Sequence, residues 1–276
     1  MKMFNKVVII GTGLIGGSLG LTLKKRHLAG QIIGLSRKKK NANLAKKAGA
    51  IDLVGTSLDV VKDADLVILA TPVDVIVNLA VKISNKLKKG CIVIDVGSSK
   101  ENIVAKLSKL IPNFIGCHPL AGSEKKGAIN LKADIFKGSV CILTPTVKTN
   151  KNALNKIELL WRNLGAKIVK LSPNKHDQIL ASTSHLPHAV AFSLMGSVPE
   201  QFLSMSSGGL NDTTRIAASD AKLWSQIFLS NRKNLLSAVS CFQKELNALK
   251  LALQNKNQRS LTKILTLANK KREKLA

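Results

Sequence analysis

The sequence contains no tyrosine, and aromatic residues make up only 3% of its 276 positions. Acidic residues are also scarce, because 16 Asp and Glu stand against 43 Lys and Arg, and the formal net charge at pH 7 is +27. A large positive charge is typical of nucleic-acid binding. Here, however, no aromatic residues are interleaved with basic ones, and lysines are spread along the whole chain. We therefore expect a lysine-rich surface that attracts anionic small molecules, and no specific nucleic-acid partner.

Long apolar runs are missing as well. No stretch approaches the roughly 18 apolar residues that span a bilayer. The first residues lead straight into a short strand-like run, without the longer apolar stretch and small-residue cleavage site of a secretion signal. We expect a cytoplasmic protein with no membrane partner.

The cysteines are few and are not spaced like a metal site or a redox pair. They are Cys91, Cys117, Cys141 and Cys241, and the first three lie inside apolar runs. Cysteine in such a setting behaves as a small hydrophobic residue. We expect these cysteines to be reduced, buried and structural.

Short apolar runs alternate with amphipathic segments over the first two thirds of the chain. The strand candidates are Val7–Ile10, Ile32–Leu35, Leu66–Leu69, Ile92–Asp95, Phe114–Cys117, Val140–Leu143 and Lys167–Val169. Amphipathic helices such as Leu14–Lys25 and Lys100–Leu110 lie between them. This order predicts an α/β fold with a doubly wound, mainly parallel Rossmann sheet. The break at Ser172-Pro173-Asn174 places the end of this domain at residue 172.

Beyond residue 174 no strand candidate remains. Apolar residues repeat in steps of four and three at Leu235, Val239, Phe242, Leu246, Leu249 and Leu253, which is a heptad seam. A second amphipathic helix is expected near Ser260 to Lys274. We predict an all-helical C-terminal domain over residues 173–276, which buries these apolar faces either on itself or on a second subunit.

The segment Gly11–Gly16 has the spacing G-x-G-x-x-G between a strand and a helix. In that setting Gly11 allows a tight turn, Gly13 lets the backbone approach a pyrophosphate, and Gly16 allows close helix–strand packing. The predicted helix has Leu14 and Ile15 as its first residues, and its N-terminus would point at the anion. The sequence therefore predicts a nicotinamide dinucleotide site, although a glycine-rich turn without a ligand would share the same spacing.

The end of the second strand indicates which dinucleotide is preferred. NAD-binding folds usually place an acidic residue there, against the ribose 2′-hydroxyl. This chain has Ser36 and Arg37 instead, which suit a 2′-phosphate, unless they form only a solvated basic loop. We predict NADP as the preferred cofactor, with NAD also possible. Thr71 and Pro72, in the turn after Leu66–Leu69, are expected to lie over the cofactor.

Two further strand ends carry Ser98 and His118 to the same edge of the sheet, where ligands bind in open parallel sheets. A histidine there can act as a general base at neutral pH, and a nearby hydroxyl can orient it or the substrate. From position alone, a loop histidine that caps a backbone group is an equal alternative.

Two later segments add polar side chains. His185 and His188 are three residues apart, but no third ligand at a suitable spacing accompanies them, so we expect no metal. Asp212 and Arg215 precede Trp224. Arg215 is suited to clamping a carboxylate, and the alternative is a surface helix N-terminus capped by Asp212.

Five segments, taken in order, resemble the prephenate and arogenate dehydrogenase family: Gly11–Gly17, Asp95–Lys100, His118–Gly122, Ser184–His188 and Asp212–Ala217. The resemblance covers nearly the whole chain. It implies the NAD(P)-dependent oxidative decarboxylation of prephenate to 4-hydroxyphenylpyruvate, a precursor of tyrosine. It also implies that the helical domain binds substrate and forms a homodimer.

The resemblance implies roles for individual residues. The histidine that matches His118 takes the proton of the substrate 4-hydroxyl, the serine that matches Ser98 assists, and the arginine that matches Arg215 holds a carboxylate. The other substrate-side residues that we predict are Glu124, His188, Asp212 and Trp224. Family members that favour prephenate have residues matching Glu124 and His188, so we favour prephenate. An NADP preference favours the alternative, an arogenate dehydrogenase that forms tyrosine directly.

Two other classes of protein remain as alternatives. One is another two-domain Rossmann dehydrogenase, such as a hydroxyacid or imine reductase. These often use a lysine base on a helix of the second domain, whereas the segment His118–Gly122 points to a different catalytic loop. The other class, favoured by the charge of +27, is a non-catalytic protein that senses NADP or binds nucleic acid. It predicts steep salt dependence of DNA binding and no turnover.

Overall fold

The structure, a computed structural model, describes residues 2–121 and 130–275. The chain divides into two compact units, Met1–Asn231 and Arg232–Ala276. The first unit contains a mixed eight-stranded sheet and the helices around it, and the second contains two long helices. Every helix in the described ranges is too short or too polar to cross a membrane.

The sheet confirms the predicted α/β architecture. Its strands are β1 (Phe4–Ile10), β2 (Ala29–Leu35), β3 (Leu53–Val54), β4 (Leu66–Leu69), β5 (Ile92–Asp95), β6 (Phe114–Pro119), β7 (Val140–Leu143) and β8 (Lys167–Lys170). Their order is β3-β2-β1-β4-β5-β6-β7-β8, and all neighbours are parallel except β6 and β7. The sequence missed β3, because two residues are too short to give a periodic pattern.

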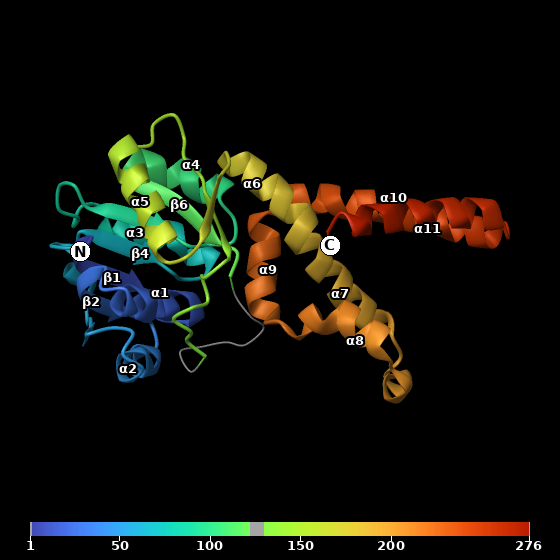
Figure 1. The fold of residues 1–276 in the computed structure, drawn as a ribbon, viewed down its shortest axis with the longest axis horizontal. Helices are drawn as coiled ribbons and strands as arrows, with labels where there is room; N and C mark the ends of the chain where they lie inside the picture. Colours follow the sequence, from blue (N-terminus) through green and yellow to red (C-terminus); the bar gives the residue numbers. More distant parts are fainter. Residues whose placement is uncertain (1, 122–129, 276) are drawn as a thin grey trace. The chain divides into compact units, whose positions relative to one another are not determined.

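Helices cover both faces of this sheet, as expected for a doubly wound fold (Figure 1). They are α1 (Leu14–Lys25), α2 (Lys39–Lys47), α3 (Val73–Ser84), α4 (Glu101–Leu110) and α5 (Lys151–Asn163), with a short 3-10 turn, η1 (Leu58–Val61). Successive side chains of a strand point to opposite faces. In β1, Val7 and Ile9 therefore pack in the core under α1, α2 and α5, while Val8 packs in the core under α3 and α4.

A helical segment follows the sheet within the first unit, again as predicted. It consists of α6 (Pro173–Leu180), the π-helical turn η2 (Ala181–His185), α7 (Leu186–Ser197), the 3-10 turn η3 (Glu200–Met205), α8 (Gly208–Thr214), the 3-10 turn η4 (Arg215–Ala218) and α9 (Ala221–Ser230). Ser172 accepts a hydrogen bond from the Lys175 N–H at the start of α6, so the Ser-Pro-Asn break is a capped helix N-terminus.

The second unit consists of α10 (Arg232–Gln254) and α11 (Gln258–Glu273), which contact each other. The predicted heptad seam lies on α10, and three of its apolar side chains are exposed among the residues that the structure describes. Phe242, Leu246 and Leu253 are 36%, 52% and 55% exposed. A row of exposed apolar side chains on one helix face is typical of a contact between proteins.

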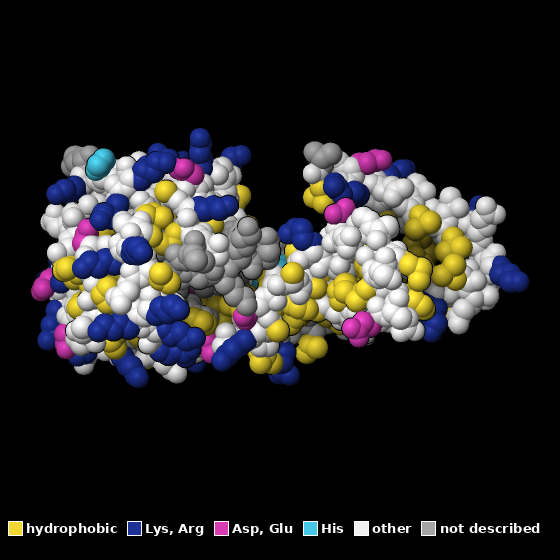
Figure 2. Space-filling view, turned by 90° about the horizontal axis from the view of Figure 1, so that it is seen from below, with side chains coloured by type: hydrophobic (Ala, Val, Ile, Leu, Met, Phe, Trp, Pro, Cys, Tyr) yellow, Lys and Arg dark blue, Asp and Glu magenta, His cyan; other side chains and the backbone are white. Residues whose placement is uncertain are grey.

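Cys91, Cys117 and Cys141 are buried and free, as expected, whereas Cys241 on α10 is free but exposed, contrary to the expectation. Cys241 is the one that lies on an amphipathic helix rather than in a strand-like apolar run, and its position on that helix faces solvent. The basic side chains are spread across the visible face in Figure 2 rather than gathered in one patch.

Candidate active site

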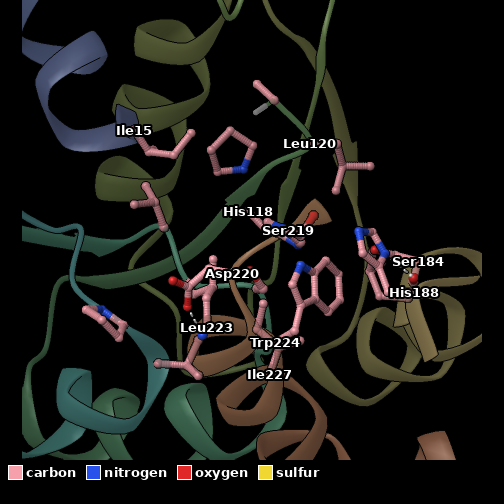
Figure 3. A pocket seen from close by; sticks show the side chains of 18 of the residues that line it. Ile15, His118, Leu120, Ser184, His188, Ser219, Asp220, Leu223, Trp224 and Ile227 are labelled. Atoms are coloured by element: carbon pink, nitrogen blue, oxygen red, sulfur yellow. Dashed lines mark hydrogen bonds between the residues drawn. The ribbon is translucent and has the colours of Figure 1, made fainter. Parts of the chain in front are cut away.

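One cavity of about 830 Å³ brings most of the predicted site residues together (Figure 3). The predicted residues that line it are Gly13, Leu14, Ile15, Thr71, Pro72, Ser98, His118, His188, Arg215 and Trp224. The volume is within the usual range for sites that hold small molecules and cofactors. The carboxyl edge of the sheet supplies one part of the wall, and the segment from α6 to α9 supplies the rest.

The glycine loop has the backbone features that its motif predicts. Gly11 has a φ of +104°, in the region that favours glycine. Its N–H donates to the Leu35 carbonyl at 2.8 Å, which ties the loop to the end of β2. A Cβ at Gly16 would lie 2.0 Å from the Gly11 carbonyl oxygen, whereas a Cβ at Gly13 would meet nothing within 4 Å. Gly11 and Gly16 therefore shape the loop, and Gly13 opens onto the cavity.

The loop and its surroundings fit a dinucleotide. The space beside Gly13 is open at the N-terminus of α1, where backbone N–H groups favour a phosphate. The hydroxyl oxygen of Thr71 is buried without a hydrogen-bond partner in the part of the chain that the structure describes. A bound ligand with polar groups would satisfy it.

Gly13→Val separates this cofactor role from a folding role. The added side chain points into open space, so we expect an unchanged melting temperature and a cofactor Kd raised at least about tenfold by the loss of close backbone approach. Gly16→Val is the matched comparison, because its clash with the Gly11 carbonyl should lower the unfolding free energy by about 3 kcal/mol. Thermal unfolding and cofactor titration measure both. Unchanged cofactor binding in Gly13→Val would place the dinucleotide elsewhere.

Ser98 lies on the loop that follows β5, and buried charges hold this loop. Asp95, at the end of the strand, pairs with Lys100, and both side chains are fully buried. The Asp95 carboxylate also accepts the Gly97 N–H at 2.9 Å. Burial raises the pKa of Asp95, and the Lys100 ammonium opposes that shift. The two ends of the loop are therefore tied together, and Ser98 between them lines the cavity.

His118 lies within β6 rather than beyond its end, because the strand is two residues longer than predicted. The first half of β6 pairs with β5 in parallel, and the second half pairs with β7 in antiparallel fashion, with His118 opposite Ile142. This pairing extends the strand into the wall of the cavity and fixes the backbone of the histidine. A strand position on a sheet holds a side chain more rigidly than a loop does.

The inner side of the His118 ring contacts a second histidine. Its Nδ1 lies 2.8 Å from Nε2 of His176 on α6, and Nδ1 of His176 lies 2.7 Å from Oδ1 of Asp177. Burial lowers the pKa of His118 well below its usual range, and the charges of His176 and Lys100 act in the same direction. Burial also lowers the pKa of His176. Both rings are therefore neutral at pH 7, which is the state in which His118 can accept a proton.

A π-helical turn positions the second pair of histidines, His185 and His188. Pro187 has no N–H to donate, so a regular helix cannot continue through it, and η2 widens the turn between α6 and α7. His188 then stacks on Trp224 of α9, with ring centroids 3.4 Å apart and planes at 20°. Its Nδ1 donates to the Ser184 carbonyl at 2.9 Å, which leaves Nε2 for a ligand. Figure 3 shows His188 and Trp224 together beside Ser184.

Lowering the pH should lower the free energy of unfolding, because four histidines have lowered pKa values in the folded protein. Burial lowers the pKa values of His118, His176 and His188, and it lowers that of His185 to about 4. The unfolded chain binds these protons near pH 6.5, so stability is complete above that pH and is lost as the pH falls below it. For His185 alone the loss reaches about 3 kcal/mol near pH 4. Melting temperatures measured from about pH 8 to about pH 5 should fall on the acid side; a constant value would contradict these lowered pKa values.

Several predicted site residues are not among the described residues that line the cavity. Ser36 and Arg37 follow β2 and do not line the cavity. Asp212 is exposed near the end of α8, so it does not cap a helix N-terminus; Asp220 caps α9 instead, accepting the Leu223 N–H at 2.5 Å. Glu124 lies outside the described residues.

Three polar residues near the cavity were not predicted from the sequence: His176, Asp177 and Asn231. His185 was considered there only as a metal ligand together with His188. His185 is buried and its Nδ1 lies 3.1 Å from Nδ2 of Asn231, which also donates to the Asp177 carbonyl at 2.7 Å. The adjacent pair His176-Asp177 in a capped first turn was a visible signal. Nothing in the sequence showed that it would meet a strand residue 58 positions earlier.

Comparison with known proteins decides the family. The model "Prephenate dehydrogenase, nucleotide-binding domain" matches residues 19–170, and "Prephenate dehydrogenase, dimerization domain" matches residues 172–267. Prephenate dehydrogenase of Bacillus subtilis is 32% identical over 285 residues, which cover 99% of this chain and 77% of that protein. The chain belongs to the prephenate dehydrogenase family. It is therefore an NAD(P)-dependent oxidoreductase, as the resemblance implied.

Solved structures agree with this assignment. The prephenate dehydrogenase of Aquifex aeolicus, crystallised with hydroxyphenyl propionate and NAD+, has a TM-score of 0.93 and 36% identity over 99% of this chain and 98% of that one. Arogenate dehydrogenase of Synechocystis has a TM-score of 0.84 and 29% identity over 98% of this chain and 100% of that one. Proteins of this fold and family thus include both prephenate and arogenate dehydrogenases.

Proposed function

We propose that this enzyme oxidatively decarboxylates prephenate to 4-hydroxyphenylpyruvate. The observation that carries the proposal is that His118, Arg215 and the open side of the glycine loop line one cavity. A base, a carboxylate clamp and a dinucleotide cradle are the three parts that this reaction needs. The relatives from Bacillus subtilis and Aquifex aeolicus support it by their names.

His118 begins the chemistry as a neutral base. As hydride leaves C4 of the substrate, positive charge grows at that carbon, and His118 takes the proton of the 4-hydroxyl so that a carbonyl forms. The bond from the ring to its carboxylate then breaks, CO2 leaves, and the electron pair of that bond makes the ring aromatic. The oxidised nicotinamide, when bound, supplies the hydride acceptor.

The remaining residues hold the reactants. We assign Gly13, Leu14, Ile15, Thr71 and Pro72 to the cofactor, together with Gly11 and Gly16, which shape the loop. Ser98 is assigned to orienting the substrate hydroxyl and His118.

Arg215 is assigned to a substrate carboxylate, because a guanidinium binds carboxylates through paired hydrogen bonds. His188 and Trp224 are assigned to the substrate side chain. Glu124 and Asp212 remain proposed substrate residues on the strength of the resemblance.

We propose prephenate as the substrate because His188 is present and lines the cavity. The competing candidate is arogenate, which carries an amino group where prephenate has a keto group. It is favoured by the arogenate dehydrogenase of Synechocystis among the similar structures. Measuring kcat/KM with both substrates distinguishes the two candidates, because each predicts the higher value with its own substrate.

The preferred cofactor is proposed to be NADP. Ser36 and Arg37 follow β2, whose last carbonyl is bonded to the glycine loop, and no acidic residue occupies this position. Arg37→Ala should lower kcat/KM for NADP about tenfold or more and leave that for NAD nearly unchanged, since only NADP has the 2′-phosphate. Steady-state kinetics with both cofactors measure this, and Lys62→Ala, on an exposed surface, is a matched control. A wild-type preference for NAD would overturn the assignment.

We also propose that the enzyme is a homodimer with its substrate-binding and dimerisation domain over residues 173–276. The match to a dimerization domain over residues 172–267 supports this. The exposed apolar positions Phe242, Leu246 and Leu253 of α10 support it as well, because a second copy would cover them.

A further inference from the structure

A chain of hydrogen bonds behind His118 links it through His176 to Asp177, and Asp177 decides which atom donates at each step. This carboxylate is only 2% exposed. Its Oδ1 accepts the Lys100 N–H at 2.8 Å, and its Oδ2 accepts the Glu101 N–H at 2.9 Å, both at the start of α4. A carboxylate that accepts two backbone hydrogen bonds at a helix N-terminus is fixed in place and has only acceptor atoms to offer.

The fixed carboxylate decides which nitrogen of His176 carries the proton. Nδ1 of His176 faces Oδ1 of Asp177 at 2.7 Å, so this nitrogen is the donor. In a neutral imidazole the other nitrogen is then an acceptor. Nε2 of His176 therefore presents a lone pair, and it presents it to Nδ1 of His118 at 2.8 Å.

The same reasoning fixes His118. Because the atom opposite its Nδ1 is an acceptor, Nδ1 of His118 carries the hydrogen, and Nε2 keeps a lone pair. Nε2 is then the nitrogen left for the cavity that His118 lines. A general base must present an unprotonated atom to the proton it takes. The opposite tautomer would present an N–H there and could not act as a base.

We propose that His176 is a positioning residue that holds His118 in its Nδ1–H tautomer, with Asp177 setting the direction of the relay. The proposal rests on the proposed function, in which His118 is the base. These hydrogen bonds also stabilise His118 after it has taken the proton. The Nδ1–H of the protonated ring still donates to His176, whose acceptor nitrogen is polarised by the Asp177 carboxylate. His176 is fully buried, and Asn231 holds the Asp177 carbonyl, so the relay is rigid on its far side.

Two substitutions at His176 separate a proton-directing role from a packing role. His176→Phe keeps a ring in the space but offers no acceptor. His176→Gln places a side-chain oxygen near the position of Nε2, where it can accept the His118 N–H. We expect His176→Phe to lower kcat by about 10–100-fold, with a change in KM below about threefold. His176→Gln should recover kcat to within about fivefold of the wild type.

¹⁵N NMR reports the tautomer of His118 directly and requires no substrate turnover. The chain contains five histidines, so the ¹⁵N signals of the labelled imidazoles can be assigned with His118→Asn as the reference spectrum. We expect the Nδ1–H pattern for His118 in the wild type and in His176→Gln. In His176→Phe we expect loss of that pattern and gain of the Nε2–H form.

Each outcome decides the proposal. An Nε2–H pattern for His118 in the wild type would overturn it, and so would an unchanged Nδ1–H pattern in His176→Phe. Equal losses of kcat in the Phe and Gln variants, with equal losses of melting temperature, would reduce His176 to a packing residue. If the wild type oxidised neither prephenate nor arogenate, the proposed function would fail, while the nitrogen signals would still decide whether the relay directs the proton.

Discussion

His118→Asn should lower kcat by about 10²- to 10⁴-fold, which is the usual contribution of a well-placed general base. The expected loss is specific, because the amide N–H of asparagine can replace Nδ1 as the donor to His176. The contact behind the ring is retained, and only the nitrogen that takes the substrate proton is lost. The cofactor Kd should stay within about twofold, since the glycine loop is untouched. Stopped-flow single turnovers and cofactor titration measure the two quantities.

The matched control is His27→Asn, the same substitution at an exposed histidine whose φ of 53° is one that asparagine tolerates. It should leave kcat and the melting temperature unchanged. Near-normal turnover by His118→Asn would remove His118 from the role of base. A large loss of cofactor affinity in that variant would show that the histidine acts through the dinucleotide site instead.

Arg215→Ala should raise KM for the substrate by about 10–100-fold, the effect of losing a charge-assisted hydrogen bond of about 1.5–3 kcal/mol. Arg215 begins η4 and lines the cavity together with His118. A carboxylate held before and during the reaction is bound about equally in the ground and transition states, so kcat should change much less than KM. Steady-state kinetics at saturating cofactor separate the two parameters.

Arg215→Lys is an informative second variant, because lysine keeps the charge but not the paired donors. It should recover only part of the lost affinity. Arg162→Ala, at an exposed position of α5, controls for the loss of one surface arginine and should leave KM unchanged. If KM were the same in Arg215→Ala and in the wild type, the carboxylate site would have to lie elsewhere in the cavity.

Much of the fold was predictable because its signals are local. Val7–Ile10 and Leu66–Leu69 are uninterrupted apolar runs, and both are central strands buried on two faces. The glycine motif lies between a strand and a helix, as its spacing requires. The seam on α10 was visible as a heptad, and its exposure in the chain now favours the subunit contact over an ordinary core helix.

The parts that were missed depend on contacts between distant segments. β6 runs on to Pro119 because β7 pairs with its second half, and no local pattern announces an antiparallel partner. His176 and Asp177 became part of the site only when α6 packed behind β6. The stack of His188 on Trp224 joins residues 36 apart through a π-helical turn that helical periodicity does not predict.

The most direct test of the account is a spectrophotometric assay of cofactor reduction at about 340 nm, with prephenate and arogenate each combined with NAD and NADP. We expect reduction of the cofactor with prephenate, faster with NADP than with NAD, and one molecule of 4-hydroxyphenylpyruvate for each molecule of cofactor reduced. Higher kcat/KM with arogenate would move the proposal to the other substrate. No reduction of either cofactor by either substrate would contradict the account.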